Sequence, residues 1–323
     1  MRKRTILAAG LGAALGLWAM GANAQERVLK AVSSFNEGSL QSVNFEQFID
    51  EVNAAGKGLI RINYIGGPKA VPPFELANAV RTGVVDIANV TGAFYSKTMP
   101  EADALKLSEM PGPEMRKNGA WAYINELHNA KLNVWYLARS VDNIPFHLYL
   151  NKPIEKPDLT GLRIRVTPVY RDFFTALGAT VMQTSPGEVY TALERGVVDG
   201  YGWPITGIFD MGWQERTKYR VDPGFYRVDV GLLVNLDVWK KLSDKEKDIM
   251  NKAALAVEER ALKLPELGQE EAKKQAAAGL QTITLKEADA KIWLAKAKET
   301  GWKTVIDQAP ETGAKLKSLI TKP

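Results

Sequence analysis

Apolar and polar residues alternate along the chain with two periods, one typical of strands and one typical of helices. Residues Leu59–Ile65 alternate position by position, which predicts a half-buried strand. Residues Val43–Ala55 place apolar side chains three or four positions apart, which predicts a helix with one buried face. Strand-like runs at Arg27–Val32 and Val84–Asn89 enclose these two elements. Strands that alternate with helices indicate an α/β protein whose sheets are flanked by helices.

One stretch of sequence occurs twice, with an offset of 113 residues. Residues Glu75–Asp86 and Glu188–Asp199 are identical at six of twelve positions. Each copy predicts a helix that ends at a left-handed glycine and continues into a buried strand. A period of this length is too long for a solenoid repeat, so it favours two similar α/β lobes. The alternative is that two unrelated helix–glycine–strand units have converged on a similar sequence.

Two segments are candidates for the connections between the lobes. The polar residues Arg139–Asn143 lie between two runs that are expected to be separate strands, and Tyr226–Val234 is another strand-like run. A capping box formed by Ser243 and Glu246 predicts the start of a long helical region. The first lobe is expected to contain residues 25–142 and 231–270, and the second lobe residues 143–230 and 271–323.

The first 24 residues have the features of a secretory signal peptide. The basic residues Arg2–Arg4 precede an apolar run at 6–20, and Ala22–Ala24 forms an A-x-A cleavage site. The apolar run is shorter than the ~20 residues that a membrane-spanning helix needs. We therefore expect a periplasmic protein that begins at Gln25. Cleavage lowers the formal net charge from +5 to +2, so the mature chain has no strong excess of positive charge of the kind that nucleic-acid-binding proteins carry.

The composition excludes many kinds of enzyme chemistry. The chain has no cysteine, so disulfides, cysteine-ligated zinc, iron–sulfur clusters and thiol catalysis are excluded. The two histidines, His128 and His147, lie in no catalytic motif, and no catalytic residue, metal ion or cofactor is expected. His128 lies in a helix-like stretch at 114–129, where we expect a surface histidine or one with satisfied hydrogen bonds. The paired acids Glu258 and Glu259 are expected on a solvated helix face.

The segment Gly161–Val166 contains the strongest candidate for ligand binding. It reads as a strand in which Arg163 and Arg165 lie on the same face. A helix-like run follows, and ligands of α/β sheets bind beyond the carboxyl ends of strands. An arginine in this place can hold a carboxylate with two parallel hydrogen bonds. The alternative is that both side chains are solvated charges on an edge strand.

Seven short motifs are spread over nearly all of the chain after residue 24. They are Phe74–Asp86, Met99–Glu101, Gly161–Arg165, Leu177–Ala179, Glu188–Leu193, Gly196–Gly200 and Asn235–Trp239. In this order they resemble the signature of the substrate-binding proteins of tripartite ATP-independent periplasmic (TRAP) transporters, the dicarboxylate-type (DctP-like) family.

The resemblance implies a periplasmic-binding-protein-like fold with two α/β lobes, crossing strands between them and a long helix that spans both. It also implies that a small organic acid is enclosed at the lobe interface. The family's carboxylate-binding arginine corresponds to Arg165, whereas Arg163 matches an exposed position and is left out of the site.

This chain departs from its family at several binding positions. Trp203 stands where sialic-acid-binding members have an asparagine, and Gly202 stands where a keto-acid-binding branch has the glutamate that helps to hold a cation. The second arginine of the sialic-acid binders is missing, and His147 is the nearest polar candidate. Their polar pair in the first lobe corresponds to Thr91 and Phe94. These departures count against a polyhydroxylated sugar acid and against a bridging cation.

The sequence therefore predicts a solute-binding receptor that captures a carboxylate and delivers it to the membrane subunits of a TRAP transporter. The competing hypothesis is a secreted two-lobed enzyme, a lyase or hydrolase that acts on a carboxylate. With Phe35 and Tyr95 expected to border the cleft beside Trp203 and Phe94, we expect a monocarboxylate with a compact apolar or aromatic body. A small keto or hydroxy acid packed against Trp203 is an alternative, and so is a purely structural role for Trp203 and Phe94. The chain is expected to act as a monomer or a homodimer.

Overall fold

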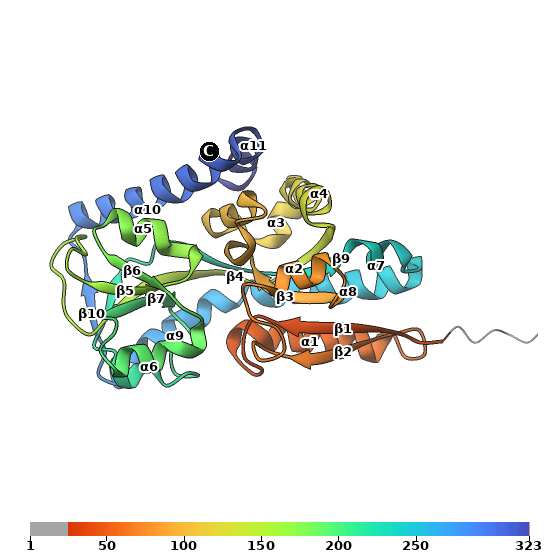
Figure 1. Ribbon diagram of the computed structural model, residues 1–323, viewed down its shortest axis with the longest axis horizontal. Helices are drawn as coiled ribbons and strands as arrows, with labels where there is room; N and C mark the ends of the chain where they lie inside the picture. The colour runs from red at the N-terminus through yellow and green to blue at the C-terminus, as the bar shows by residue number, and fades with distance from the viewer. Residues whose placement is uncertain (1–24, 323) are drawn as a thin grey trace, which may run out of the picture.

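Hydrogen-bonded strands run without interruption through both halves of the molecule (Figure 1). The computed structural model describes residues 25–322, so the predicted signal peptide lies outside the described residues. Eight strands follow one another in the order β2-β1-β3-β9-β4-β7-β5-β6, and β8 and β10 extend the sheet from β4. The strands are β1 (Arg27–Ser33), β2 (Ile60–Gly66), β3 (Ile87–Thr91), β4 (Val134–Leu150), β5 (Arg163–Val166), β6 (Thr180–Gln183), β7 (Gly200–Pro204), β8 (Tyr219–Asp222), β9 (Arg227–Asn235) and β10 (Gln281–Thr284).

The first lobe is built around β1, β2 and β3, which are parallel to one another. Helix α1 (Leu40–Ala55) covers this sheet, and it buries Phe45, Phe48, Ile49 and Val52 on the face that the sequence predicts. Helices α2 (Leu76–Arg81), α4 (Ala120–Leu132), α7 (Leu236–Lys241) and α8 (Asp244–Ala261) complete the lobe. The expected capping box of Ser243 and Glu246 opens α8.

The second lobe repeats this plan around the parallel strands β5, β6 and β7. Helices α5 (Arg171–Ala176) and α6 (Val189–Glu194) belong to it. In each copy of the repeated sequence a helix ends before a glycine in the left-handed region, Gly83 with φ 75° and Gly196 with φ 62°. The strands β3 and β7 follow these glycines, so the predicted helix–glycine–strand unit is confirmed in both lobes.

Strands β4 and β9 connect the lobes, which confirms both predicted crossings. The expectation of two separate strands around Arg139–Asn143 was wrong, because β4 is one continuous strand of 17 residues. Its pairing with β9 shows irregularities at three places along this stretch. The strand continues through its polar residues because Arg139 and Asp142 form a buried ion pair with an N–O distance of 2.9 Å. Two polar side chains that satisfy each other do not require a solvated loop.

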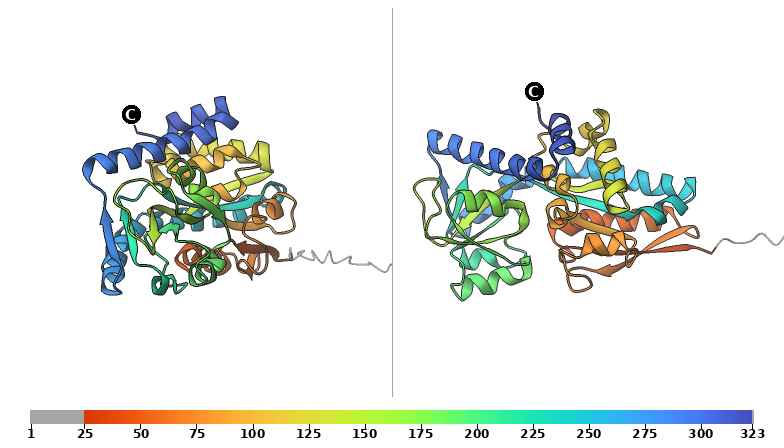
Figure 2. Two further views of the ribbon diagram at one scale, coloured as in Figure 1. Left: turned by 60° about the vertical axis from the view of Figure 1, so that its left-hand side comes forward. Right: turned by 45° about the horizontal axis from the view of Figure 1, so that its top comes forward.

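The C-terminal helices lie against both lobes (Figure 2). Helix α9 (Leu264–Ala277) packs on β4, and α10 (Glu287–Gln308) contacts α5 of the second lobe and the short 3-10 helix η2 (Pro100–Leu107). Helix α11 (Pro310–Ile320) then packs on η2 and α4 of the first lobe. A helix that contacts both lobes was expected from the family resemblance, and the expected lobe boundaries stay a prediction.

Two local expectations are corrected by the structure. The helix-like stretch 114–129 is broken into α3 (Gly112–Lys117) and α4, because Gly119 adopts a left-handed conformation with φ 86°. Glu258 does not lie on a solvated face: it is 2% exposed, and its carboxylate accepts a 2.9 Å hydrogen bond from Arg116. Among the described helices, none combines the length and the apolar character that crossing a membrane requires.

Candidate functional site

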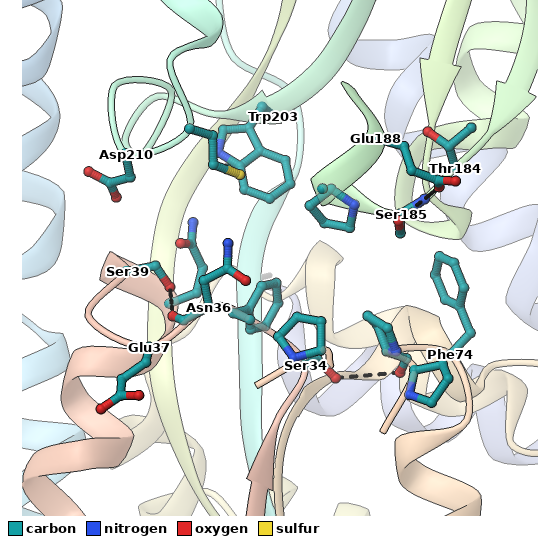
Figure 3. Close-up of a pocket in the computed structure, with 18 of the residues that line it drawn as sticks. Ser34, Asn36, Glu37, Ser39, Phe74, Thr184, Ser185, Glu188, Trp203 and Asp210 are labelled. Carbon is teal, nitrogen blue, oxygen red and sulfur yellow. Dashed lines mark hydrogen bonds between the residues drawn. The ribbon is translucent and has the colours of Figure 1, made fainter. Parts of the chain in front are cut away.

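A cleft of about 750 Å³ lies between the two lobes (Figure 3). Its first wall comes from the loop after β1, the start of α1 and the residues before α2, including Ser34, Ser39 and Phe74. Its second wall comes from the loop after β6, from β7 and from the loop beyond it, including Thr184, Trp203 and Asp210. Both walls lie at the carboxyl ends of parallel strands, where the sequence predicts a ligand.

A smaller cavity of about 30 Å³, here called the inner pocket, lies next to the cleft. Phe35, Gln41 and Trp203 line both spaces, so the inner pocket borders the cleft along these three side chains. Its other walls come from η1 (Gly92–Tyr95) and the residues around it, from the crossing strands β4 and β9, and from the segment after β5.

Arg165 has no exposed surface and lines neither the cleft nor the inner pocket, but it is bonded to Thr184, which lines the cleft, and to Tyr170, which lines the inner pocket. Its guanidinium donates a 2.6 Å hydrogen bond to the backbone oxygen of Thr184 and a 3.1 Å bond to the hydroxyl of Tyr170. Its Nε lies 3.4 Å from Oγ1 of Thr184. Within the described residues no carboxylate forms an ion pair with it, and burial lowers its pKa below the usual value. Three contacts use three of the five N–H groups of a guanidinium, so two are left for a ligand.

Tyr170 holds this arginine in place. Burial raises the pKa of Tyr170, so its hydroxyl keeps its proton, which it donates to the backbone oxygen of Gly202. The ring lies over Gly202 so closely that a Cβ atom at this position would come within 2.5 Å of it. Tyr170 therefore occupies the place where a longer side chain at position 202 would enter the site.

Trp203 forms one side of both the cleft and the inner pocket. Its ring lies 6.0 Å from the guanidinium carbon of Arg165 and packs edge-on against Trp213 at 4.8 Å. The side chain is 4% exposed, and its indole nitrogen has no hydrogen-bond partner among the described residues.

The structure brings three further predicted residues to the inner pocket. Phe35 and Phe94 line it together, with their ring centroids 6.2 Å apart. Thr91 also lines it, but its hydroxyl donates a 3.2 Å hydrogen bond to Asp229. The pocket therefore presents a largely aromatic wall on the side of the first lobe.

Tyr95 and His147 lie elsewhere. The hydroxyl of Tyr95 is 2.9 Å from Nε2 of His128, which is buried and also bonded to a backbone oxygen, as a satisfied histidine should be. Nδ1 of His147 lies 2.9 Å from the carboxylate of Asp222. Neither Tyr95 nor His147 lines the cleft or the inner pocket, and their contact with a ligand stays a prediction.

Sequence reasoning missed three residues of this site: Gln41, Tyr170 and Thr184. Gln41 and Thr184 carry no sequence signal, because their roles come from contacts between segments that are distant in the chain. The sequence gives a weak signal for the close contact that Tyr170 makes. Gly202 lies between two large aromatic residues, Tyr201 and Trp203, and a glycine inside a strand indicates that another group packs closely against the strand at that position.

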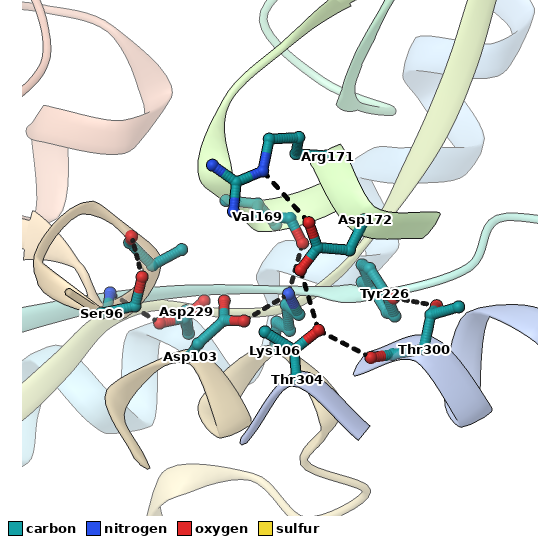
Figure 4. Close-up of polar contacts among 12 residues, drawn as sticks. Ser96, Asp103, Lys106, Val169, Arg171, Asp172, Tyr226, Asp229, Thr300 and Thr304 are labelled. Carbon is teal, nitrogen blue, oxygen red and sulfur yellow. Dashed lines mark hydrogen bonds and ion pairs between the residues drawn. The ribbon is translucent and has the colours of Figure 1, made fainter. Parts of the chain in front are cut away.

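A polar cluster joins the lobes behind the inner pocket (Figure 4). Lys106 of η2 forms a 2.7 Å ion pair with Asp103 and donates a hydrogen bond to the backbone oxygen of Val169 in the second lobe. Thr304 of α10 donates a 2.8 Å bond to Asp172 of α5. Nowhere in residues 25–322 do three His, Cys, Asp or Glu side chains gather as metal ligands would.

Comparison with known proteins identifies the family. Residues 32–307 match the family described as "Bacterial extracellular solute-binding protein, family 7" (DctP). A solute-binding protein of Roseobacter denitrificans is 27% identical over 260 residues, which cover 76% of this chain and 78% of that protein. A monocarboxylate 2-oxoacid-binding periplasmic protein of Nostoc is 25% identical over 211 residues, 61% of this chain and 57% of that protein.

Solved structures show the same two-lobed fold. An extracytoplasmic solute receptor of Bordetella pertussis that binds pyroglutamic acid superimposes with a TM-score of 0.81 at 20% identity, over 91% of this chain and 99% of that one. The TRAP periplasmic solute-binding protein of Roseobacter denitrificans with bound L-galactonate gives a TM-score of 0.78 at 23% identity, over 92% and 99%. The expected fold is confirmed, and the enzyme hypothesis is wrong. The chain belongs to family 7 of the bacterial extracellular solute-binding proteins, which are transport receptors and not enzymes.

Proposed function

We propose that this protein captures a small organic monocarboxylate between its lobes and delivers it to the membrane subunits of a TRAP transporter. The observation that carries the proposal is the buried guanidinium of Arg165, which has free N–H groups and no acidic partner among the described residues. A buried cation without a counter-ion is costly, and a bound carboxylate supplies the missing charge. A hydrogen bond to a charged group contributes about 1.5–3 kcal/mol.

The walls of the site support a single carboxylate on a compact apolar or aromatic body. Phe35, Phe94 and Trp203 line the inner pocket, where aromatic faces offer apolar contact and stacking. A second buried carboxylate would need its own cation, and the nearby buried cation Lys106 is already paired with Asp103, whereas Arg165 has no carboxylate partner among residues 25–322. Pyroglutamic acid and 2-oxoacids, which two similar proteins bind, are also compact monocarboxylates. L-galactonate, bound by the Roseobacter protein, is a polyhydroxylated one.

The receptor would work by binding and closure and not by chemistry. The crossing strands β4 and β9 connect the two walls of the cleft, and a carboxylate held by Arg165 would contact the first lobe through Phe35 and Phe94. Closure of two lobes around a ligand then presents one combined surface to the permease. We further propose that residues 1–24 direct export to the periplasm and are removed there.

Calorimetric titration with aliphatic monocarboxylates, C4-dicarboxylates, sugar acids and aromatic acids tests the proposal. We expect saturable one-to-one binding of a compact monocarboxylate and no turnover of it on prolonged incubation. A sugar acid or a C4-dicarboxylate as the tightest ligand would contradict the ligand class, and consumption of the acid would contradict the receptor role.

A further inference from the structure

Two buried N–H groups beside the inner pocket have no acceptor within the described residues. They are Nε2 of Gln41 and Nε1 of Trp203, on side chains that are 3% and 4% exposed. Buried donors in folded proteins almost always have a partner, because an unsatisfied one loses its hydration without compensation. An unsatisfied donor beside a binding cleft therefore indicates a group that arrives with the ligand.

The two donors approach each other from opposite lobes. Gln41 belongs to α1 of the first lobe, and Trp203 belongs to β7 of the second. A Cβ atom on Gly207 would lie 3.2 Å from Nε1 of Trp203, 3.4 Å from Nε2 of Gln41 and 3.7 Å from Oε1 of Gln41, so the indole nitrogen and the amide of Gln41 face the same point. One acceptor atom bound between them would link the two lobes directly.

These two donors lie at a different place in the site from the guanidinium group of Arg165. Arg165 is bonded to Thr184, and Trp203 lies between Thr184 and the loop that carries Asp210 (Figure 3). Gly207 precedes Asp210 on that same loop, so the Nε1 edge of the indole ring lies on the side away from Thr184. A flat ligand packed on Trp203 would thus have Arg165 at one end and the two donors at the other.

We infer that Gln41 and Trp203 bind a second hydrogen-bond acceptor of the ligand, a carbonyl oxygen separated from the carboxylate by the body of the molecule. The inference rests on the proposed function, since it assumes that Arg165 holds the carboxylate. An indole nitrogen only donates, so the group opposite it must accept. Gln41 and Trp203 are then specificity-determining residues, which select a carbonyl-bearing acid over an apolar acid of the same shape.

Matched pairs of acids test this selection. The probes are 3-oxocyclopentanecarboxylate against cyclopentanecarboxylate, 4-oxopentanoate against pentanoate, and 4-formylbenzoate against 4-methylbenzoate, each titrated calorimetrically. We expect the carbonyl acid to bind at least about tenfold more tightly in one pair or more, because a site built to bond a polar group rejects an analogue that lacks it. Equal or tighter binding of the carbonyl-free acid in every pair would overturn the inference and leave the proposed function in place. Failure of all six acids to bind would overturn the proposed function itself.

Two variants test whether Gln41 and Trp203 are responsible for the preference for carbonyl-bearing acids. In Gln41→Leu and Trp203→Phe we expect the carbonyl preference, the ratio of the two dissociation constants within a pair, to fall at least about threefold, whatever the change in overall affinity. Gln281→Leu, which changes an exposed glutamine of β10 outside the cleft, is the matched control and should keep the preference. An unchanged preference in Gln41→Leu would overturn the assignment of this residue.

A thermal measurement separates a ligand-binding role for Gln41 from a structural one. Because its Nε2 is unsatisfied without ligand, the unliganded Gln41→Leu protein should melt at the same temperature as the wild type or about 2 °C higher. A marked fall in melting temperature would show that the amide serves the fold, which would also overturn the inference.

Discussion

Arg163 and Arg165 show how neighbours give two identical side chains different roles. They lie two positions apart in β5, where alternation puts them on one face. Arg163 is half-exposed and pairs with Asp199 at 3.1 Å, whereas Arg165 is buried and has only neutral partners. Asp199 is satisfied by Arg163, and this pairing holds its pKa well below the usual range. Of the two, only the buried arginine lacks an acidic partner among the described residues.

The two arginines also provide a matched test. Arg165→Lys should weaken binding of the cognate carboxylate at least about tenfold, because a lysine cannot reproduce the planar donors and a charged hydrogen bond contributes about 1.5–3 kcal/mol. Arg163→Lys should leave the affinity within about twofold of the wild type. Calorimetry on both folded proteins makes the comparison, and equal affinity of Arg165→Lys and wild type would show that Arg165 does not hold the carboxylate.

Gly202 is the residue on which the position of Tyr170 depends. In Gly202→Ala the added methyl group would meet the Tyr170 ring at 2.5 Å, so the ring must move and its bond to Arg165 must loosen. We expect a loss of about 1–3 kcal/mol in unfolding free energy, as for other overpacked sites, together with weaker ligand binding. Denaturant unfolding measures the first effect. Gly187→Ala, where a Cβ would meet open space, is the control for stability, and the same small change in both variants would contradict this account.

At the scale of elements, β9 contains an acid in an unusual environment. Asp229 is 2% exposed and accepts hydrogen bonds from the backbone N–H of Gly92 at 3.0 Å and from Thr91 at 3.2 Å. The pKa of this carboxyl is raised to about 7, mainly by burial and also by Asp103, against the opposing effects of Arg139, the hydrogen bond from Gly92, and Lys106. The hydrogen bonds join β9 to η1, which borders the inner pocket.

This carboxyl group makes stability depend on pH in a defined direction. Between its ordinary pKa of 3.8 and about 7 the folded state binds the proton more tightly than the unfolded state, so this group's contribution to stability falls as pH rises. Asp229→Asn cannot titrate and should lose this component. Unfolding free energies measured from pH 4 to pH 8 should therefore decline more steeply, or rise less, in the wild type than in the variant. Parallel curves would show that Asp229 titrates normally.

At the scale of the whole molecule, the sequence predicts the local units better than their assembly. The α1 face, the capping box of α8 and the repeated helix–glycine–strand unit depend on neighbours within a few positions, and all were predictable. The single strand β4 was not, because its continuity depends on the buried Arg139–Asp142 pair. Likewise nothing local indicates that α11 returns to pack on α4, or that Gln41 and Trp203 approach from separate lobes. Arg165 was singled out by family resemblance, and its partners were not.

Export is a property of the whole chain that can be tested. If Arg2–Arg4, the apolar run and Ala22–Ala24 act as a signal peptide, protein recovered from the periplasm should begin at Gln25. Intact-mass spectrometry of that fraction decides the matter. Soluble cytosolic protein that keeps Met1 would contradict the prediction.

The continuity of β4 also determines how the protein unfolds. The strand pairs with β9 from Val134 to Pro145 and with β7 from Phe146 to Leu150, so one segment completes the sheets of both lobes. The largest hydrophobic core likewise contains side chains of both lobes, such as Val90 and Ile164. Neither lobe can therefore melt without removing a strand and part of the core from the other. Two lobes that move as separate bodies in function should thus behave as one cooperative unit in thermal unfolding, with a single calorimetric transition.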